Sequence, residues 1–165
     1  MSVGVIYRYF ASKEAIIEAI VARDMAEMSA KFDVWDATPD DQLLDSLLGI
    51  VDEAIEHHYT LDKAGLALEV LAEAARNPKV AATVARADAQ ERELGRTLWR
   101  RIAPDLKGEA LAAREELMVM LFDGLMVRAV SNPQTDRKAL AQAFRQIMRI
   151  MMTLPADAPC RDAPL

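Results

Sequence analysis

The stretch "SVGVIYRYFASKEAIIEAI", residues 2–20, opens the chain with a short aromatic segment, a Ser-Lys break and the start of a longer helix. We expect a helix of about eight residues from Ser2 to Tyr9, which is too short to be stable in water unless it docks on neighbouring structure. One side of this helix is apolar and is formed by Val3, Ile6 and Phe10. This side predicts burial against the rest of a small domain.

The other side of the same helix suits contact with nucleic acid. Gly4 lets the helix backbone come close to a partner, and Tyr7 offers a hydroxyl group on a stiff stem. Arg8 and the positive N-terminal end of the next helix, where Lys13 lies in the first turn, can hold phosphate groups. These features suit a recognition helix that enters the major groove of DNA.

The stretch resembles the end of the DNA-binding domain in TetR/AcrR-family transcriptional regulators. Those proteins show a Ser or Thr, a variable residue and a Gly, then an aliphatic-Tyr-x-x-Phe run, then a Lys-Glu pair that opens the following helix. The match is dense over residues 2–20. Farther along, "LEVLAEAARNPKVAA" (68–82) and "MLFDGLMVRAV" (120–130) are similar to segments of the family's ligand-binding and dimerisation domain.

The resemblance implies an all-α protein and a residue-by-residue role for the opening stretch. Ser2, Gly4 and Tyr7 would face DNA, with Arg8 beside them, and Lys13 would grip phosphate at the start of the linking helix. It also implies a DNA-binding transcriptional repressor in which a small effector, bound in the C-terminal domain, releases operator DNA.

The resemblance also implies a division of the chain. Residues 1–31 would form a partial helix-turn-helix region, with the recognition helix at about 2–9 and the linking helix at about 12–31. Residues 32–154 would form a helical ligand-binding and dimerisation domain. The prolines of residues 155–165 predict a disordered tail.

The sequence departs from the family at its beginning. The family's DNA-binding domain has three helices, and this sequence starts at the third. We therefore expect either a piece of a longer regulator or a truncated product, and we expect this chain alone to bind operator DNA poorly. The alternative is a DNA-independent, dimeric small-molecule-binding protein.

Composition supports a helical protein and narrows its class. Hydrophobic residues make up 52% of the chain and aromatic residues 5%, and the net charge of −6 argues against a surface coated with basic residues for nucleic acid. The single cysteine, Cys160, excludes a disulfide framework and a cysteine zinc cluster. The sequence shows no catalytic motif, so we expect a cytoplasmic non-enzyme with no cofactor, no metal and no membrane segment.

Residues that start and stop helices divide the chain clearly. Ser12 predicts a helix to about Lys31, and Thr38-Pro39 predicts one to about His57. Thr60 opens the next helix, and Asn77-Pro78 opens one that Pro104 must end. The last two helices are expected at about 109–131 and from about Asp136 to Leu154.

The last two helices predict a homodimer. In "LMVMLFDGLMVRAV" (117–130) apolar residues occupy nearly every face, so a partner subunit must cover part of this helix. Gly124 would let two helices approach closely, although ordinary core filling is the alternative reading of this methionine-rich pair. The predicted interface residues are Met118, Leu121, Gly124, Leu125, Phe144, Ile147 and Met151.

Large or amphipathic side chains on different helices supply material for a ligand pocket. A mainly apolar lining would suit a hydrophobic or aromatic effector, although core packing is the alternative for each side chain. His57 and His58 point about 100° apart on a helix, so they cannot both chelate one ion from the same helix. The candidate pocket residues are Phe32, His58, Tyr59, Leu71, Trp99 and Phe122.

Overall fold

The computed structural model describes residues 8–155, and within them every regular element is a helix. The helices are α2 (Lys13–Asp36), α3 (Asp40–Gly49), α4 (Val51–His58), α5 (Leu61–Ala74), α6 (Pro78–Ile102), α7 (Gly108–Ser131) and α8 (Arg137–Thr153). The all-α prediction is confirmed. The expected recognition helix at 2–9 lies outside the described residues except for Arg8 and Tyr9, which form a turn, and the expected tail lies outside them beyond Pro155.

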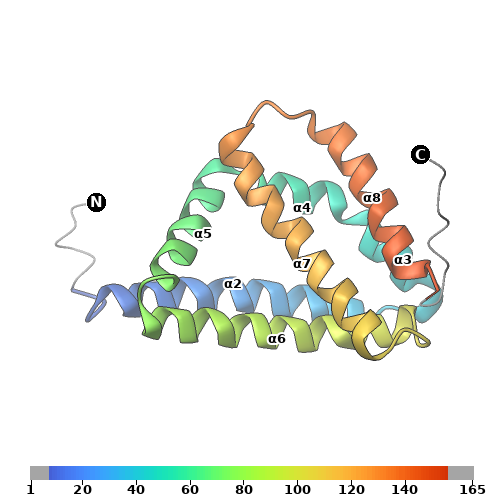
Figure 1. Cartoon of the computed structure of the whole chain (residues 1–165), viewed down its shortest axis with the longest axis horizontal. Coiled ribbons are helices and arrows are strands. Elements are labelled where there is room, and N and C mark those ends of the chain that lie inside the picture. The colour runs from blue at the N-terminus through green and yellow to red at the C-terminus, as the bar shows by residue number, and fades with distance from the viewer. Residues whose placement is uncertain (1–7, 156–165) are drawn as a thin grey trace.

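Two long helices form one edge of the molecule. In Figure 1, α2 and α6 lie side by side, α5 rises from one end of this pair, and α7 descends from the top of α5 to the other end. Helix α8 packs against α4 and α3 at the end of the molecule opposite α5. Within the described residues, no helix is both long and apolar enough to cross a membrane.

Three helices start with a side-chain cap. Ser12 Oγ accepts a hydrogen bond from the Ala15 amide at 3.2 Å, and Asn77 Oδ1 accepts one from the Lys79 amide at 3.1 Å. Asp136 Oδ1 does the same for the Lys138 amide at 3.0 Å. Such caps satisfy amide groups that have no partner within the helix. The predicted starts at Ser12 and Asn77-Pro78 are confirmed.

Thr38 and Thr60, which precede α3 and α5, donate hydrogen bonds to the preceding helix and do not cap the following one. The hydroxyl of Thr38, predicted as a cap, donates to the carbonyl of Val34 at 2.9 Å, and the hydroxyl of Thr60 donates to Glu56 at 2.9 Å. Both carbonyls lie in the last turn of the preceding helix, where they lack intrahelical partners. Thr60 precedes α5 as predicted, but the capping role predicted for Thr38 is wrong.

Two predicted helix boundaries are also wrong. The linking helix continues to Asp36, and the expected single helix from Thr38 to His57 is broken at Ile50 into α3 and α4. Buried residues recur at helical spacing on both sides of the break, as at Leu47 and Val51, so the sequence pattern gave no sign of it.

The buried side chains form two clusters at opposite ends of α2. The larger cluster includes Trp35 of α2 and residues of α3, α4, α6, α7 and α8. The smaller one joins Ile17 of α2 to Val70 of α5 and Val80 of α6. Helix α2 therefore spans the distance between two separate cores.

Leu43 is a test of the larger core because its side chain is fully buried. We expect Leu43→Ala to lower the free energy of unfolding by about 3 kcal/mol, since it removes buried methyl groups and leaves a cavity. Urea titration followed by circular dichroism measures this. Leu61→Ala, at a 57% exposed site, is the control and should change it by less than about 1 kcal/mol. Equal effects of the two substitutions would contradict the assigned core.

Candidate functional site

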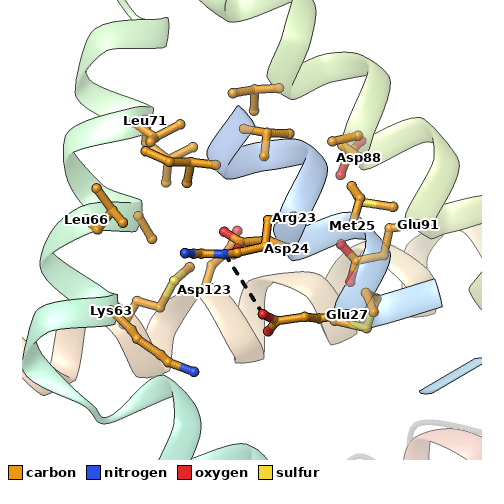
Figure 2. A pocket seen from close by; sticks show the side chains of 18 of the residues that line it. Arg23, Asp24, Met25, Glu27, Lys63, Leu66, Leu71, Asp88, Glu91 and Asp123 are labelled. Atoms are coloured by element: carbon orange, nitrogen blue, oxygen red, sulfur yellow. Dashed lines mark hydrogen bonds and ion pairs between the residues drawn. The ribbon is translucent and has the colours of Figure 1, made fainter. Parts of the chain in front are cut away.

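A cavity of about 860 Å³ lies between α2, α5, α6 and α7, with the end of α4 at its margin. Figure 2 shows the side chains that line it. Most of its apolar wall is made of small or flexible side chains: Met25 and Met28 of α2, Ala67 and Leu71 of α5, Ala81, Val84 and Ala85 of α6, and Val119 and Met126 of α7. A volume of this size accommodates a small organic molecule.

Carboxyl groups line one wall of the cavity. Glu91 of α6 and Asp123 of α7 both have a raised pKa, first because burial disfavours the charged form and then because Asp88 lies nearby. Asp88 itself pairs with Arg92 at 2.8 Å. This wall therefore offers hydrogen-bond acceptors beside an apolar surface.

Paired charges lie on the α2 side of the cavity. Arg23 bonds Asp24 at 2.7 Å and lies 3.9 Å from Glu27, the interaction marked in Figure 2. At the margin of the cavity, Lys63 Nζ of α5 lies 2.9 Å from Nδ1 of His57 of α4. Arg23 and Lys63 thus both have a partner within the chain.

The two histidines end α4 and differ in their surroundings. Burial is the main reason why the pKa of His58 is lowered to about 4, and its ring packs 5.5 Å from that of Phe122. The pKa of His57 is also lowered, by burial and by Lys63. Both imidazoles are neutral at pH 7, and residues 8–155 contain no group of three or more His, Cys, Asp or Glu side chains placed to hold a metal ion.

The predicted pocket residues occupy two different places. His58 and Leu71 line the cavity. Tyr59 and Trp99 are buried in the larger core, and Phe32 and Phe122 pack against it. The hydroxyl of Tyr59 donates to Thr135 at 3.1 Å, which satisfies its polar group there.

Sequence reasoning missed most of the cavity wall. Alanines such as Ala67, Ala81 and Ala85 line it. The prediction selected large side chains, whereas a cavity forms where side chains are too small to fill the space between helices. The carboxyl groups of Glu91 and Asp123 inside a helical apolar pattern were the available signal.

The start of α2 holds the described part of the predicted DNA-binding set. Arg8 is exposed, and Lys13, with 55% of its side chain exposed, bonds Glu73 of α5 at 2.8 Å. Ser2, Gly4 and Tyr7 lie outside the described residues. Lys13 retains donors that can reach a phosphate, because an ammonium group has three.

The predicted dimer residues divide between the interior and the surface. Leu125, Phe144 and Met151 are buried within the chain, whereas Met118 and Leu121 are half-buried. Ile147 is 43% exposed, and a Cβ atom added to Gly124 would meet nothing within 4 Å. Further large apolar side chains on these helices are exposed, and we call them together the apolar face of α7 and α8: Leu117, Met120, Val127 and Val130 of α7, Ile150 of α8, and Leu154 just after α8.

Comparison with known proteins places this helical arrangement in a family. The family model of the BetI-type transcriptional repressor C-terminal region matches residues 43–152, which include the walls of the cavity on α5, α6 and α7 and the apolar face of α7 and α8. The chain belongs to the TetR family of transcriptional regulators. The resemblance found in the opening residues is thereby confirmed by a different part of this TetR-family chain.

Individual relatives are also transcriptional regulators. The HTH-type transcriptional regulators UidR of Escherichia coli K12 and of Shigella flexneri are each 33% identical to this chain over 84 residues. The alignment covers 50% of this TetR-family chain and 40% of each relative. The chain thus spans less than half the length of the relatives it matches.

The neutral state of His58 predicts a pH-dependent stability. The unfolded chain binds a proton at this ring near pH 6.5, whereas the folded chain does so only near pH 4. Stability should therefore fall by about 3 kcal/mol as the pH falls between these values, and His58→Phe should remove that part of the loss. Urea titrations of both proteins at pH 7, 5.5 and 4 measure it, and parallel pH profiles would contradict a buried neutral imidazole.

Proposed function

We propose that the protein to which this chain belongs is a ligand-responsive transcriptional repressor whose effector binds in the cavity between α2, α5, α6 and α7. The observation that carries this proposal is the cavity of about 860 Å³, because α2, which leads to the DNA-binding end, forms one of its walls. A molecule in this space contacts the linking helix directly. Its occupancy therefore has a physical route to the DNA-binding end.

Repression by such a mechanism is a shift between two arrangements. The effector must bind the DNA-incompetent arrangement more tightly than the DNA-bound one, since equal affinity shifts nothing. The apolar wall favours an effector with a hydrophobic or aromatic body. Glu91 and Asp123 add acceptors for a donor group on that body.

We also propose that the exposed turn at Arg8 and the start of α2 at Lys13 contact the DNA backbone. A positive helix N-terminus and a lysine in its first turn both attract phosphate. Ser2, Gly4 and Tyr7 would face the bases and backbone from the recognition helix. The two cationic side chains would give affinity without base specificity.

The apolar face of α7 and α8 supports a homodimer. Exposed residues such as Met120 and Val127 on α7 and Ile147 and Ile150 on α8 recur at helical spacing, so each helix presents a continuous apolar stripe. Two copies that join these stripes would bury both in a four-helix arrangement. A symmetric dimer also presents two DNA-binding ends to a two-fold operator.

DNA binding tests the proposed function. We expect the protein extended upstream through the helices that precede the recognition helix to bind duplex DNA with a steep salt dependence, as measured by fluorescence anisotropy. Lys13→Ala in that protein should weaken binding about tenfold on every sequence and lower the salt slope by about one.

Lys107→Ala is the matched control, because it removes the same charge from an exposed position just before α7, at the other end of the molecule. It should leave the affinity unchanged within about twofold. If the extended protein does not bind DNA, the DNA-independent small-molecule-binding protein becomes the better reading.

Gly124 gives a clean test of the dimer. A side chain here meets nothing within 4 Å in the chain itself, so Gly124→Leu should leave the fold intact and hinder only a close approach of two subunits. We expect its dimer dissociation constant to rise at least tenfold by sedimentation equilibrium. Gly95→Leu on α6, at an equally open position, is the control. A dimer of unchanged affinity in Gly124→Leu would place the interface elsewhere.

A further inference from the structure

The carboxylate of Glu73 accepts hydrogen bonds from the side chains of Lys13, Arg76 and Asn77. Its Oε2 atom accepts from Lys13 Nζ of α2 at 2.8 Å, and from Nη2 of Arg76, just after α5, at 2.6 Å. Asn77, the cap of α6, lies beside it and donates to Glu14 of α2 at 3.0 Å. The first turn of α2 is therefore tied to the corner between α5 and α6.

The side chain of Glu73 is largely shielded from solvent. Only 12% of its side chain is exposed, although the side chains of its two cationic partners are more than half exposed. The hydrogen bonds from Lys13 and Arg76 are the main reason why its pKa is lowered to about 2. The carboxylate thus stays charged throughout the pH range in which the protein would work.

The same helix forms a wall of the cavity. Val70, Leu71 and Ala74 of α5 line the cavity, and Glu73 lies among them in sequence but contacts α2 instead. Val70 also packs with Ile17 of α2 in the smaller core. A displacement of the C-terminal half of α5 must therefore be felt at the start of α2.

The other end of α2 has an independent anchor. Trp35 lies in the larger core, and Arg101 of α6 donates to the carbonyls of Trp35 at 3.0 Å and Asp36 at 3.2 Å. Arg101 also bonds Asp40 at 2.6 Å. With its C-terminal end fixed in this way, α2 can respond to α5 mainly by moving its N-terminal end.

We propose that Glu73 is the positioning residue that couples the α5 wall of the cavity to the N-terminal end of α2. The relevance of this coupling to gene regulation rests on the proposed function, because the position of Lys13 controls DNA binding only if Lys13 contacts the DNA backbone. The coupling itself is a property of this chain. It joins the C-terminal end of α5 to the N-terminal end of α2 through the carboxylate of Glu73.

Hydrogen exchange in this chain tests the link without DNA. Glu73→Gln should speed exchange of the amides at 13–20 about tenfold and leave those at 30–36 unchanged, because only the first end of α2 loses its tie. Glu69→Gln, at an exposed position on the same helix, is the matched control and should change neither segment.

A cavity-filling substitution then distinguishes coupling from simple stabilisation. Ala67→Trp places a large side chain in the cavity and should change exchange at 13–20 at least threefold, whereas Ala72→Trp, on the exposed side of α5, should not. In the Glu73→Gln background the same filling should change exchange at 13–20 less than twofold, since the hydrogen bond between α5 and Lys13 is lost and only the apolar Ile17–Val70 contact remains. Ala67→Leu replaces Ala67→Trp if circular dichroism shows lost helix.

Two results would overturn the coupling: no response of residues 13–20 to cavity filling, or an equal response with and without Glu73. DNA takes no part in this experiment, so it stands apart from the test of the proposed function. If this chain shows the coupling but the extended protein binds no DNA, the inference about Glu73 stands and the proposed repressor function is wrong.

Discussion

The packing of α2 along α6 is the constraint on which the rest of the structure depends. Helix α2 runs from Lys13 to Asp36 and buries only two residues deeply, Ile17 near one end and Trp35 near the other. Each belongs to a different hydrophobic cluster. Because burial of apolar surface is the main source of stability, the position of α2 is set by these two separated contacts.

A helix held at two points leaves room between them, and that room is the cavity. Between Ile17 and Trp35, Met25 and Met28 of α2 line the cavity opposite α5, α6 and α7, and the walls formed by α5 and α6 are rich in alanine. Native interiors are otherwise packed to nearly crystalline density, so a space of about 860 Å³ is a built feature of the arrangement. The carboxyl groups of Glu91 and Asp123 make the wall formed by α6 and α7 polar, and the charged side chains of Arg23, Asp24 and Glu27 lie on the α2 side.

The charged contacts of α2 complement its sparse apolar ones. Arg101 fixes the C-terminal end through two carbonyl groups and a carboxylate, while Glu73 fixes the N-terminal end through Lys13. Both contacts join residues more than fifty positions apart in sequence, so they form only when the helices have assembled. In Figure 1, α8 lies toward the opposite end of the molecule from the start of α2, so the α8 part of the surface proposed for dimerisation is separated from the end proposed for DNA.

The sequence by itself determined the helices, most of their starts and the family. Capping side chains such as Ser12 and Asn77 act on neighbouring amides, and helical spacing is a local property, so both can be read from a single chain. Tertiary structure alone decided the break at Ile50, the burial of Tyr59 and Trp99 away from the cavity, and the pairing of Lys13 with Glu73. Each of these depends on which helices meet, and a cavity in particular is space that helices leave when they pack, which no run of residues records.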